Sequence, residues 1–447
     1  MPGKAGKLRR VSVPGAEFQE CSYLDDLTTA GTLRTGHTNA QDWHSLHAQG
    51  TLNPRGVPGL QADGYFPDDS KTTKASDYIE PRPGRGIYYY DQGNFYGNKK
   101  YPHDSQFVMR FPDDWNGKLV VTAPPGLRGQ YANDFIISDH VLAKGYAFAA
   151  TDKGNSGLQF SRDDEKLYPN GKSPGSAVAE WHQRVRELTI AAKEAAEEYY
   201  GERPYRTYVT GISNAGYITR YALENDPELY DGGVDWEGPL WLAEGPNLLT
   251  FLPKALNNPK DAGFDAEETA FLWAYHSIIY WPSTQRTYRQ EFDPDFDPDY
   301  KHDEAEYDYG KRINPEENPQ AQEIKNAVAR VSLTGDIGKP LMTLHGTLDT
   351  LLPITKTSDV YAELVKKAGR SDLHCYYRIE GGNHVDSLYD HAGFRDKLRP
   401  ILPCYRAAFK ALENWVEEGH EPPPDELVPK RKASGLQEHA LPEVNFC

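Results

Sequence analysis

The chain has 447 residues, of which 49 are Lys or Arg and 66 are Asp or Glu, so its formal net charge at pH 7 is −17. A surface of this charge repels phosphate backbones and carries no basic patch, which excludes a nucleic-acid-binding function. No stretch is long and apolar enough to cross a membrane, whereas the chain is long enough to bury a large core. These properties predict a globular protein of one to three domains.

The N-terminal residues 1–15 include basic side chains but lack the apolar segment of a secretory signal, so we expect a cytoplasmic protein. A secreted protein whose signal has been removed would have the same sequence. The four cysteines, Cys21, Cys375, Cys404 and Cys447, fit no zinc-binding spacing and include no Cys-x-x-Cys pair. We expect free thiols at these positions.

The predicted elements change in character along the chain. Residues 1–75 show weak periodicity and are expected to wrap the core as an irregular segment, and residues 76–110 resemble edge strands and turns. Beyond residue 110, short apolar runs alternate with amphipathic runs, several of which end at a glycine. The predicted strands are 118–124, 146–152, 206–211, 232–238, 339–346 and 374–382. The predicted helices are 131–145, 179–201, 214–225 and 357–369.

Strands and helices that alternate this regularly predict an α/β fold, with a mostly parallel sheet and helices on both of its faces. The alternation breaks between residues 245 and 335, where helical segments surround an acidic, proline-broken run, and we expect an inserted helical cap there. The predicted core therefore consists of residues 76–244 and 336–420, followed by a C-terminal tail at 421–447.

Ser213, Asp349 and His384 each lie a few residues after a predicted strand, in this order along the chain. In an open parallel sheet, ligands bind at the edge where the strands have their carboxyl ends. A serine hydroxyl becomes a nucleophile when a histidine takes its proton, and a buried carboxylate fixes the tautomer of that histidine. The three residues are therefore candidates for nucleophile, acid and base.

Residues 208–217, YVTGISNAGY, have the composition of a strand that turns sharply into a helix at a nucleophile. Such an elbow brings the strand and the helix nearly into contact, so the residues that flank the serine must be small. Gly211, Ala215 and Gly216 meet this requirement.

The backbone N–H of Asn214 begins the predicted helix and lacks a helical partner, so it can donate to a developing oxyanion. A second donor is expected from the loop 124–130, which follows another predicted strand. Gly126 and Leu127 are the candidates there.

Other carboxylates compete for the role of the acid. Asp235 and Glu237 end a predicted strand, and Asp386 follows the histidine closely. The neighbouring Asp152 and Lys153, also at a strand end, are interpreted as a structural ion pair, with contact to the substrate as the alternative.

His345 lies within a predicted strand and is interpreted as a packed structural histidine. The acidic run 293–299 lacks the glycine and the closing glutamate of an EF-hand, so it is interpreted as a solvated loop. We expect neither a metal ion nor an organic cofactor, because acyl transfer through a serine needs neither.

Three motifs resemble those of the α/β-hydrolase superfamily. They are GISNAG at 211–216 for the nucleophile, HGTLDTLLP at 345–353 for the acid and EGGNH at 380–384 for the histidine. The resemblance extends from about residue 105 to residue 415, and it implies the α/β-hydrolase fold.

Within that superfamily, residues 126–157 and 224–241 resemble the tannase/feruloyl-esterase-like enzymes, and more closely a bacterial branch associated with 3-hydroxybutyrate oligomer hydrolysis. This resemblance implies ester hydrolysis through an acyl-enzyme beneath a cap domain. Tannase and feruloyl-esterase members typically carry disulfide-bonded cysteines directly before the serine and directly after the histidine. This chain has Ile212 and Val385 at those positions.

The leading hypothesis is a serine carboxylic-ester hydrolase that acts on hydroxyalkanoate oligomers or related polyester fragments. The alternatives are an aromatic-acid esterase of the tannase or feruloyl type, an amidase or aminopeptidase with the same triad, and a binding protein with a relict site. The expected partner is a small-molecule or oligomeric ester rather than nucleic acid or a membrane, and the sequence does not indicate an oligomeric state.

Overall fold

The computed structural model describes residues 11–32, 82–88, 105–154, 176–296, 304–386 and 393–430, apart from positions 17, 18, 30, 127, 266, 279, 385 and 395 within these ranges. The predictions for Leu127 and Val385 lie outside the described residues.

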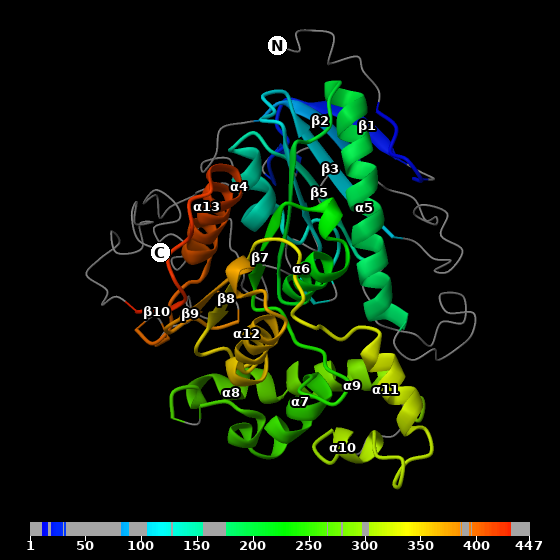
Figure 1. Cartoon of the computed structure of the whole chain (residues 1–447), viewed down its shortest axis with the longest axis vertical. Helices are drawn as coiled ribbons and strands as arrows, with labels where there is room; N and C mark the ends of the chain where they lie inside the picture. The colour runs from blue at the N-terminus through cyan, green and yellow to red at the C-terminus, as the bar shows by residue number, and fades with distance from the viewer. Residues whose placement is uncertain are drawn as a thin grey trace.

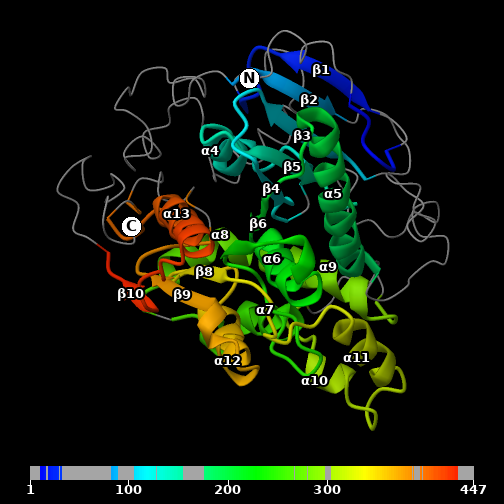
Figure 2. The same ribbon diagram turned by 45° about the horizontal axis from the view of Figure 1, so that its top comes forward.

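Ten strands of the described part of the chain form one sheet, in the order β1-β2-β3-β5-β4-β6-β7-β8-β9-β10 (Figures 1 and 2). The strands are β1 Glu20–Leu24, β2 Gly84–Tyr88, β3 Phe107–Pro112, β4 Lys118–Thr122, β5 Ala147–Thr151, β6 Arg206–Ile212, β7 Gly232–Trp236, β8 Leu341–Gly346, β9 His374–Ile379 and β10 Glu426–Val428. The pairs from β1 to β5 are antiparallel, whereas every neighbouring pair from β5 to β10 is parallel.

Helices cover both faces of this sheet, with α5 and α13 on opposite sides in Figure 1. The core helices are α4 Asp139–Leu142, α5 Ser176–Tyr200, α6 Asn214–Asn225, α12 Ser358–Lys367 and α13 Leu402–Glu418. In β4, Leu119 and Val121 join an apolar cluster with residues of α5, α6 and α12, whereas Val120 joins a second cluster with residues of α4 and α13. Alternate side chains of a strand point to opposite faces, so a strand covered on both sides is apolar along its length. The predicted α/β architecture is confirmed.

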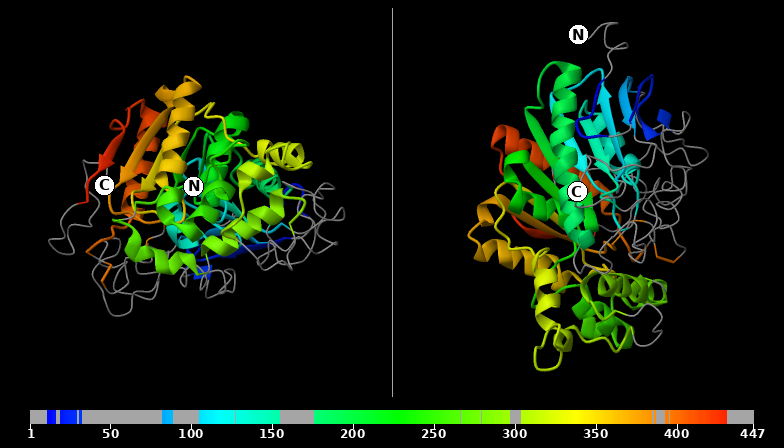
Figure 3. Two further views of the ribbon diagram at one scale, coloured as in Figure 1. Left: turned by 90° about the horizontal axis from the view of Figure 1, so that it is seen from below. Right: turned by 90° about the vertical axis from the view of Figure 1, so that its right-hand side faces the viewer.

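A second group of helices lies between β7 and β8 in the sequence and gathers at one end of the sheet (Figures 1 and 3). We call this segment, residues 248–329, the helical insertion. Its α-helices are α7 Leu248–Asn257, α8 Ala270–Ser277, α9 Tyr280–Phe292, α10 Tyr309–Arg312 and α11 Ala321–Ala329. The Trp281 indole N–H donates to the carbonyl of Thr350 at 2.7 Å. The helical insertion therefore contacts the loop that follows β8, at the carboxyl edge of the sheet.

Some elements differ from the predicted ones. β1 lies in the segment expected to be irregular, and β10 lies in the predicted tail. The predicted helix 131–145 is a π-helix, Asp134–Ser138, followed by the short α4. Arg110 donates to Asp134 Oδ1 at 2.6 Å and to Ser138 Oγ at 2.8 Å. The buried guanidinium thus binds both ends of the π-helical turn.

Cys21 and Cys375 are free thiols, as expected. The expectation is wrong for Cys404, which is disulfide-bonded. Within the described residues, no helix has the length and apolar character needed to span a membrane.

Candidate active site

Ser213 is the single residue between β6 and α6, where the chain reverses direction. Its backbone has φ 57° and ψ −121°, a left-handed conformation that costs about 1–3 kcal/mol for a residue with a side chain. The Ser213 N–H donates to the carbonyl of Trp236, at the end of β7, at 2.8 Å. The serine is therefore held in a strained turn at the carboxyl edge of the sheet, as an elbow requires.

The small residues around Ser213 are required by the close approach of α6 to the sheet. A Cβ atom added to Gly211 would lie 2.2 Å from the Cβ of Ala215, and one added to Gly216 would lie 2.4 Å from Asp235 Oδ1. Both distances are shorter than van der Waals contact. The prediction that small side chains are needed beside the nucleophile agrees with this packing.

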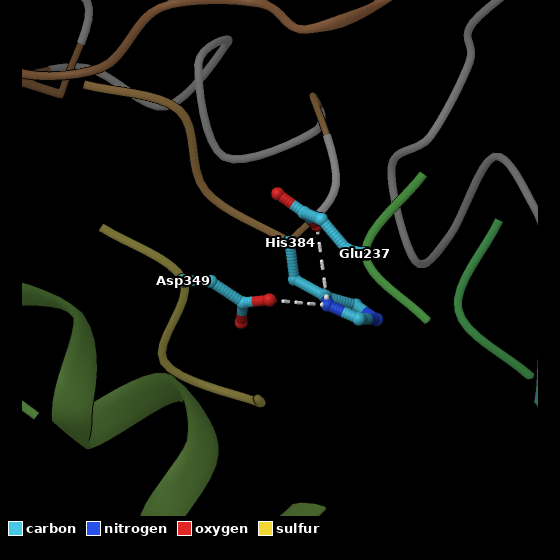
Figure 4. Close-up of side chains that lie close together, drawn as sticks. All are labelled: Glu237, Asp349 and His384. Carbon is cyan, nitrogen blue, oxygen red and sulfur yellow. Dashed lines mark hydrogen bonds and ion pairs between the residues drawn. The ribbon is translucent and has the colours of Figure 1, made fainter. Parts of the chain in front are cut away.

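His384 and Asp349 form a buried hydrogen-bonded pair (Figure 4). The imidazole Nδ1 lies 2.8 Å from Asp349 Oδ2, and the second ring nitrogen points away from the carboxylate. Asp349 Oδ1 accepts the backbone N–H groups of Leu351 and Leu352 at 2.7 and 2.9 Å. Burial raises the pKa of Asp349, but the charges and hydrogen bonds of His384 and His345 outweigh it and hold the pKa well below its usual value. Asp349 is thus an anion that fixes the imidazole.

Glu237 is the second carboxyl group at His384. Its Oε2 lies 3.3 Å from His384 Nδ1, on a different side of the ring from Asp349 (Figure 4). Burial, together with the negative charge of Asp349, raises the pKa of Glu237 well above its usual value. The side chain was one of the rival acids in the sequence, and it shares the histidine with Asp349 instead of replacing it.

The two other rival acids have structural partners. Asp235 Oδ2 forms a buried ion pair with Arg220 at 2.6 Å, and its Oδ1 accepts the N–H of Gly238 at 2.8 Å. Asp386 accepts the N–H groups of Ile401 and Leu402, at the start of α13. Neither contacts His384 among the described hydrogen bonds.

The sheet brings the elbow and the histidine to the same edge. Ser213 follows β6, Asp349 follows β8 and His384 follows β9, with only β7 between the first two strands. Among the described residues, no hydrogen bond joins Ser213 Oγ to His384. Catalytic hydrogen bonds are often long in unliganded enzymes and tighten when substrate binds.

The two described oxyanion candidates lie close together. Asn214 is the first residue of α6, and its side-chain amide is 3.5 Å from the carbonyl oxygen of Gly126. Gly126 has φ 52°, and a Cβ atom added there would meet no atom within 4 Å. The loop thus turns at a glycine beside the elbow.

Lys153 binds backbone carbonyls of this loop. Its ammonium donates to the carbonyl of Pro124 at 2.9 Å and to that of Gly126 at 2.6 Å, and it lies 4.7 Å from the ring centre of Trp181. Burial lowers the pKa of Lys153 well below its usual value. The predicted ion pair with Asp152 is wrong, because the carboxylate of Asp152 instead accepts from Ser105 and from the N–H of Gly154.

His276 of the helical insertion also contacts the loop after β8 that carries Asp349 and Thr350, which we call the acid loop. Its Nδ1 lies 2.5 Å from Thr350 Oγ1, one residue after Asp349. Burial lowers the pKa of His276 to about 4, so the ring is neutral at physiological pH.

The buried His345 contacts the acid, with Nε2 3.1 Å from Asp349 Oδ2, and also binds Ser358. It is packed as predicted and adds a contact that the sequence did not indicate.

Within the described residues, one group of potential metal ligands has its atoms within 4.8 Å of one another: Glu237, Asp349 and His384. The hydrogen bond between His384 and Asp349 uses the ring nitrogen that a metal ion would need.

In the acidic run, Asp293 and Asp295 bind the guanidinium of Arg312, each at 2.6 Å. Arg312 supplies the positive charge for both carboxylates.

The strained serine after β6, the mostly parallel sheet and the buried His–Asp pair at neighbouring strand ends have the arrangement of the α/β-hydrolase fold. Two family models match separate parts of the chain. Residues 97–235, which include the elbow, match the model of tannase and feruloyl esterase. Residues 301–444, which include the acid and the histidine, match the model of 3HB-oligomer hydrolase.

Curated relatives share shorter stretches. The chain is 26% identical over 140 residues to a mono(2-hydroxyethyl) terephthalate hydrolase of Piscinibacter sakaiensis, covering 30% of this chain and 23% of that protein. It is 27% identical over 112 residues to a D-(-)-3-hydroxybutyrate oligomer hydrolase of Cupriavidus pinatubonensis, covering 24% of this chain and 16% of that one. The matches thus span less than a quarter of the length of either relative.

Among solved structures, feruloyl esterase B from Aspergillus oryzae aligns over 77% of this chain and 84% of its own, with 15% identity and a TM-score of 0.47.

Proposed function

We propose that this protein is a serine carboxylic-ester hydrolase that works through an acyl-enzyme. The observation that carries the proposal is the strained Ser213 at the same sheet edge as the buried His384–Asp349 pair. A nucleophile, a base and an oriented acid at adjoining strand ends are the parts that acyl transfer needs.

In the proposed mechanism, the ring nitrogen of His384 that faces away from Asp349 takes the proton of Ser213 as the serine attacks the ester carbonyl. The oxyanion accepts the backbone N–H groups of Asn214 and the Gly126 loop, each worth about 3–4 kcal/mol of barrier. His384 then protonates the leaving alcohol, and water cleaves the acyl-enzyme by the reverse use of the same groups. Asp349 holds the imidazole throughout and stabilises its positive form.

For the substrate class, we infer hydroxyalkanoate oligomers or related polyester fragments. The match of residues 301–444 to the 3HB-oligomer hydrolase model supports this inference. The similarity to a terephthalate monoester hydrolase favours one alternative, an aromatic-acid ester. Both substrate classes present an ester carbonyl, so the acyl group is what an assay must vary.

The test combines labelling with an ester panel. A fluorophosphonate probe should label the wild-type protein at Ser213, and Ser213→Ala should abolish both labelling and hydrolysis while leaving the unfolding midpoint nearly unchanged. The panel compares 3-hydroxybutyrate oligomers, terephthalate monoesters, ferulate and gallate esters, and aminoacyl anilides. Full esterase activity in the Ser213→Ala variant would refute the mechanism. Faster cleavage of the anilides than of the esters would show that the protein is an amidase and not an esterase.

A further inference from the structure

Glu237 occupies a place on the sheet edge that the proposed mechanism does not use. The neighbouring strands β6, β7, β8 and β9 are followed by Ser213, Glu237, Asp349 and His384 respectively. Glu237 is fully buried, and it lies between the elbow and the acid in this order.

The backbone and one carboxyl oxygen of Glu237 are fixed. Its φ is 55°, an uncommon value for a residue with a side chain, and its N–H donates to the carbonyl of Leu344 at 2.8 Å. Oε1 accepts the N–H of Gly346 at 2.6 Å. A Cβ atom added to Gly346 would lie only 2.9 Å from Oε1, so the acid loop approaches the carboxyl group at a glycine.

The other oxygen of Glu237 is buried without a hydrogen bond to any described residue. It lies 3.3 Å from His384 Nδ1, whose hydrogen bond is directed to Asp349. A buried oxygen without a partner is destabilising, so such an arrangement calls for an explanation in function. The nearby Nδ1–H of His384 is the donor that can form a hydrogen bond with this oxygen.

We propose that Glu237 is a second positioning residue for His384, whose Oε2 accepts the Nδ1–H when the ring carries the proton of Ser213. This inference rests on the proposed function. A small rotation of the ring transfers the hydrogen bond from one carboxyl group toward the other, and no covalent bond is made or broken. The positive ring is thereby held between two carboxyl groups.

The kinetic test compares Glu237→Gln, Asp349→Ala and the double variant on the best ester of the panel. Glu237→Gln should lower kcat about 10-fold with little change in KM, and Asp349→Ala should lower it about 10²-fold, less than the roughly 10⁴-fold loss expected of a sole acid. The double variant should lose more than the product of the two single losses, because each carboxyl group covers for the other.

Glu224→Gln is the matched control. Glu224 is another largely buried carboxyl group with a raised pKa, and it binds Thr334, Gly335 and Tyr361. A loss of folding alone would affect Glu224→Gln and Glu237→Gln alike. A double variant that is no worse than Asp349→Ala, or that matches the product of the single losses, would overturn the proposal for Glu237.

A measurement without turnover separates this proposal from the proposed function. In protein with Ser213→Ala and labelled histidine, the NMR signal of the His384 Nδ1–H should shift once Glu237→Gln is added, because one of the two carboxyl groups beside that N–H becomes an amide. The other groups that face the pair, Asp235, His276, His345, Asp349 and Asp386, stay the same in this comparison. An unchanged signal would overturn the role of Glu237, whereas absent hydrolysis and labelling in the wild type would overturn the esterase mechanism.

Discussion

The hydroxyl of Tyr288, on α9 of the helical insertion, donates a hydrogen bond to the side-chain oxygen of Asn214 at 3.1 Å. Asn214 directly follows the proposed nucleophile and begins α6. Trp281 and His276 of the same insertion bind Thr350, directly after Asp349. The helical insertion is therefore attached to both the nucleophile turn and the acid loop.

We expect Tyr288→Phe to lower kcat/KM about 5-fold, the effect of one hydrogen bond of about 1 kcal/mol. The ring still packs against Trp241, so the change removes the hydroxyl contact to Asn214 and leaves the ring in place. The measurement is steady-state hydrolysis of the best ester. Tyr309→Phe is the control, because that hydroxyl binds the carbonyl of Ala243 at 2.8 Å, also from the helical insertion. Equal losses in the two variants would contradict a specific role of the Tyr288 contact.

Lys153→Met should lower kcat about 10-fold or more, because the carbonyls of Pro124 and Gly126 lose their donor and the oxyanion loop is no longer fixed. KM should change little if the loop acts mainly on the transition state. Lys144→Met is a matched control: this partly buried ammonium binds Glu413 at 2.8 Å and lies 5.2 Å from the ring centre of Phe409. A Lys153→Met enzyme with wild-type kcat would show that the loop is held by other contacts.

Gly211→Ala should destabilise the fold by about 1–3 kcal/mol, as overpacking of a tight core does, and reduce hydrolysis with it. The new methyl group would meet the Cβ of Ala215 at 2.2 Å. Adding Ala215→Gly should restore part of the stability, since backbone atoms of residue 215 remain 2.8 and 3.0 Å away. Urea unfolding of the single and double variants measures this. If the second change brings no recovery, Ala215 is not the source of the clash.

Asp139→Asn should stabilise the protein more at pH 7 than at pH 4. Burial raises the pKa of Asp139 from 3.8 to about 7, so between these values the folded state binds a proton that the unfolded chain has lost. The free energy of unfolding therefore falls as pH rises through this window. The loss is about 1.4 kcal/mol for each pH unit, which amounts to a few kcal/mol over the whole window. The asparagine has no such loss and can still accept the N–H of Thr29.

Urea unfolding at several pH values from 4 to 7 measures the stability difference between Asp139→Asn and wild type. The exposed Asp336→Asn serves as the control. A difference that stays constant over this range would contradict the raised pKa.

The sequence predicts the elements whose cause is local. The helix 214–225 agrees with α6 at both ends, and its start is marked by Ser213, which interrupts the strand directly before it. The contacts that complete the site could not be predicted in the same way. The sequence pairs Lys153 with its neighbour Asp152, whereas its partner Gly126 is 27 residues away and offers a backbone carbonyl, which side-chain patterns do not reveal.

Glu237 shows the same limit in another form. Its place at a strand end made it a rival to Asp349, since a sequence suggests one acid for one histidine. Only the order of the strands, with β7 beside β8, brings both carboxyl groups to the same ring. Tyr288 lies 74 residues from Asn214, so the contact between the helical insertion and the elbow had no sequence signal.

The three residues of β10 have a consequence for any shortened form of the protein. They pair with β9, which leads to His384, and they make β9 an interior strand of the sheet. A chain cut after residue 420 would leave β9 as an open edge, with unpaired N–H and C=O groups that recruit strands from other molecules. Truncation at this end would therefore promote aggregation and loosen the strand that carries the histidine.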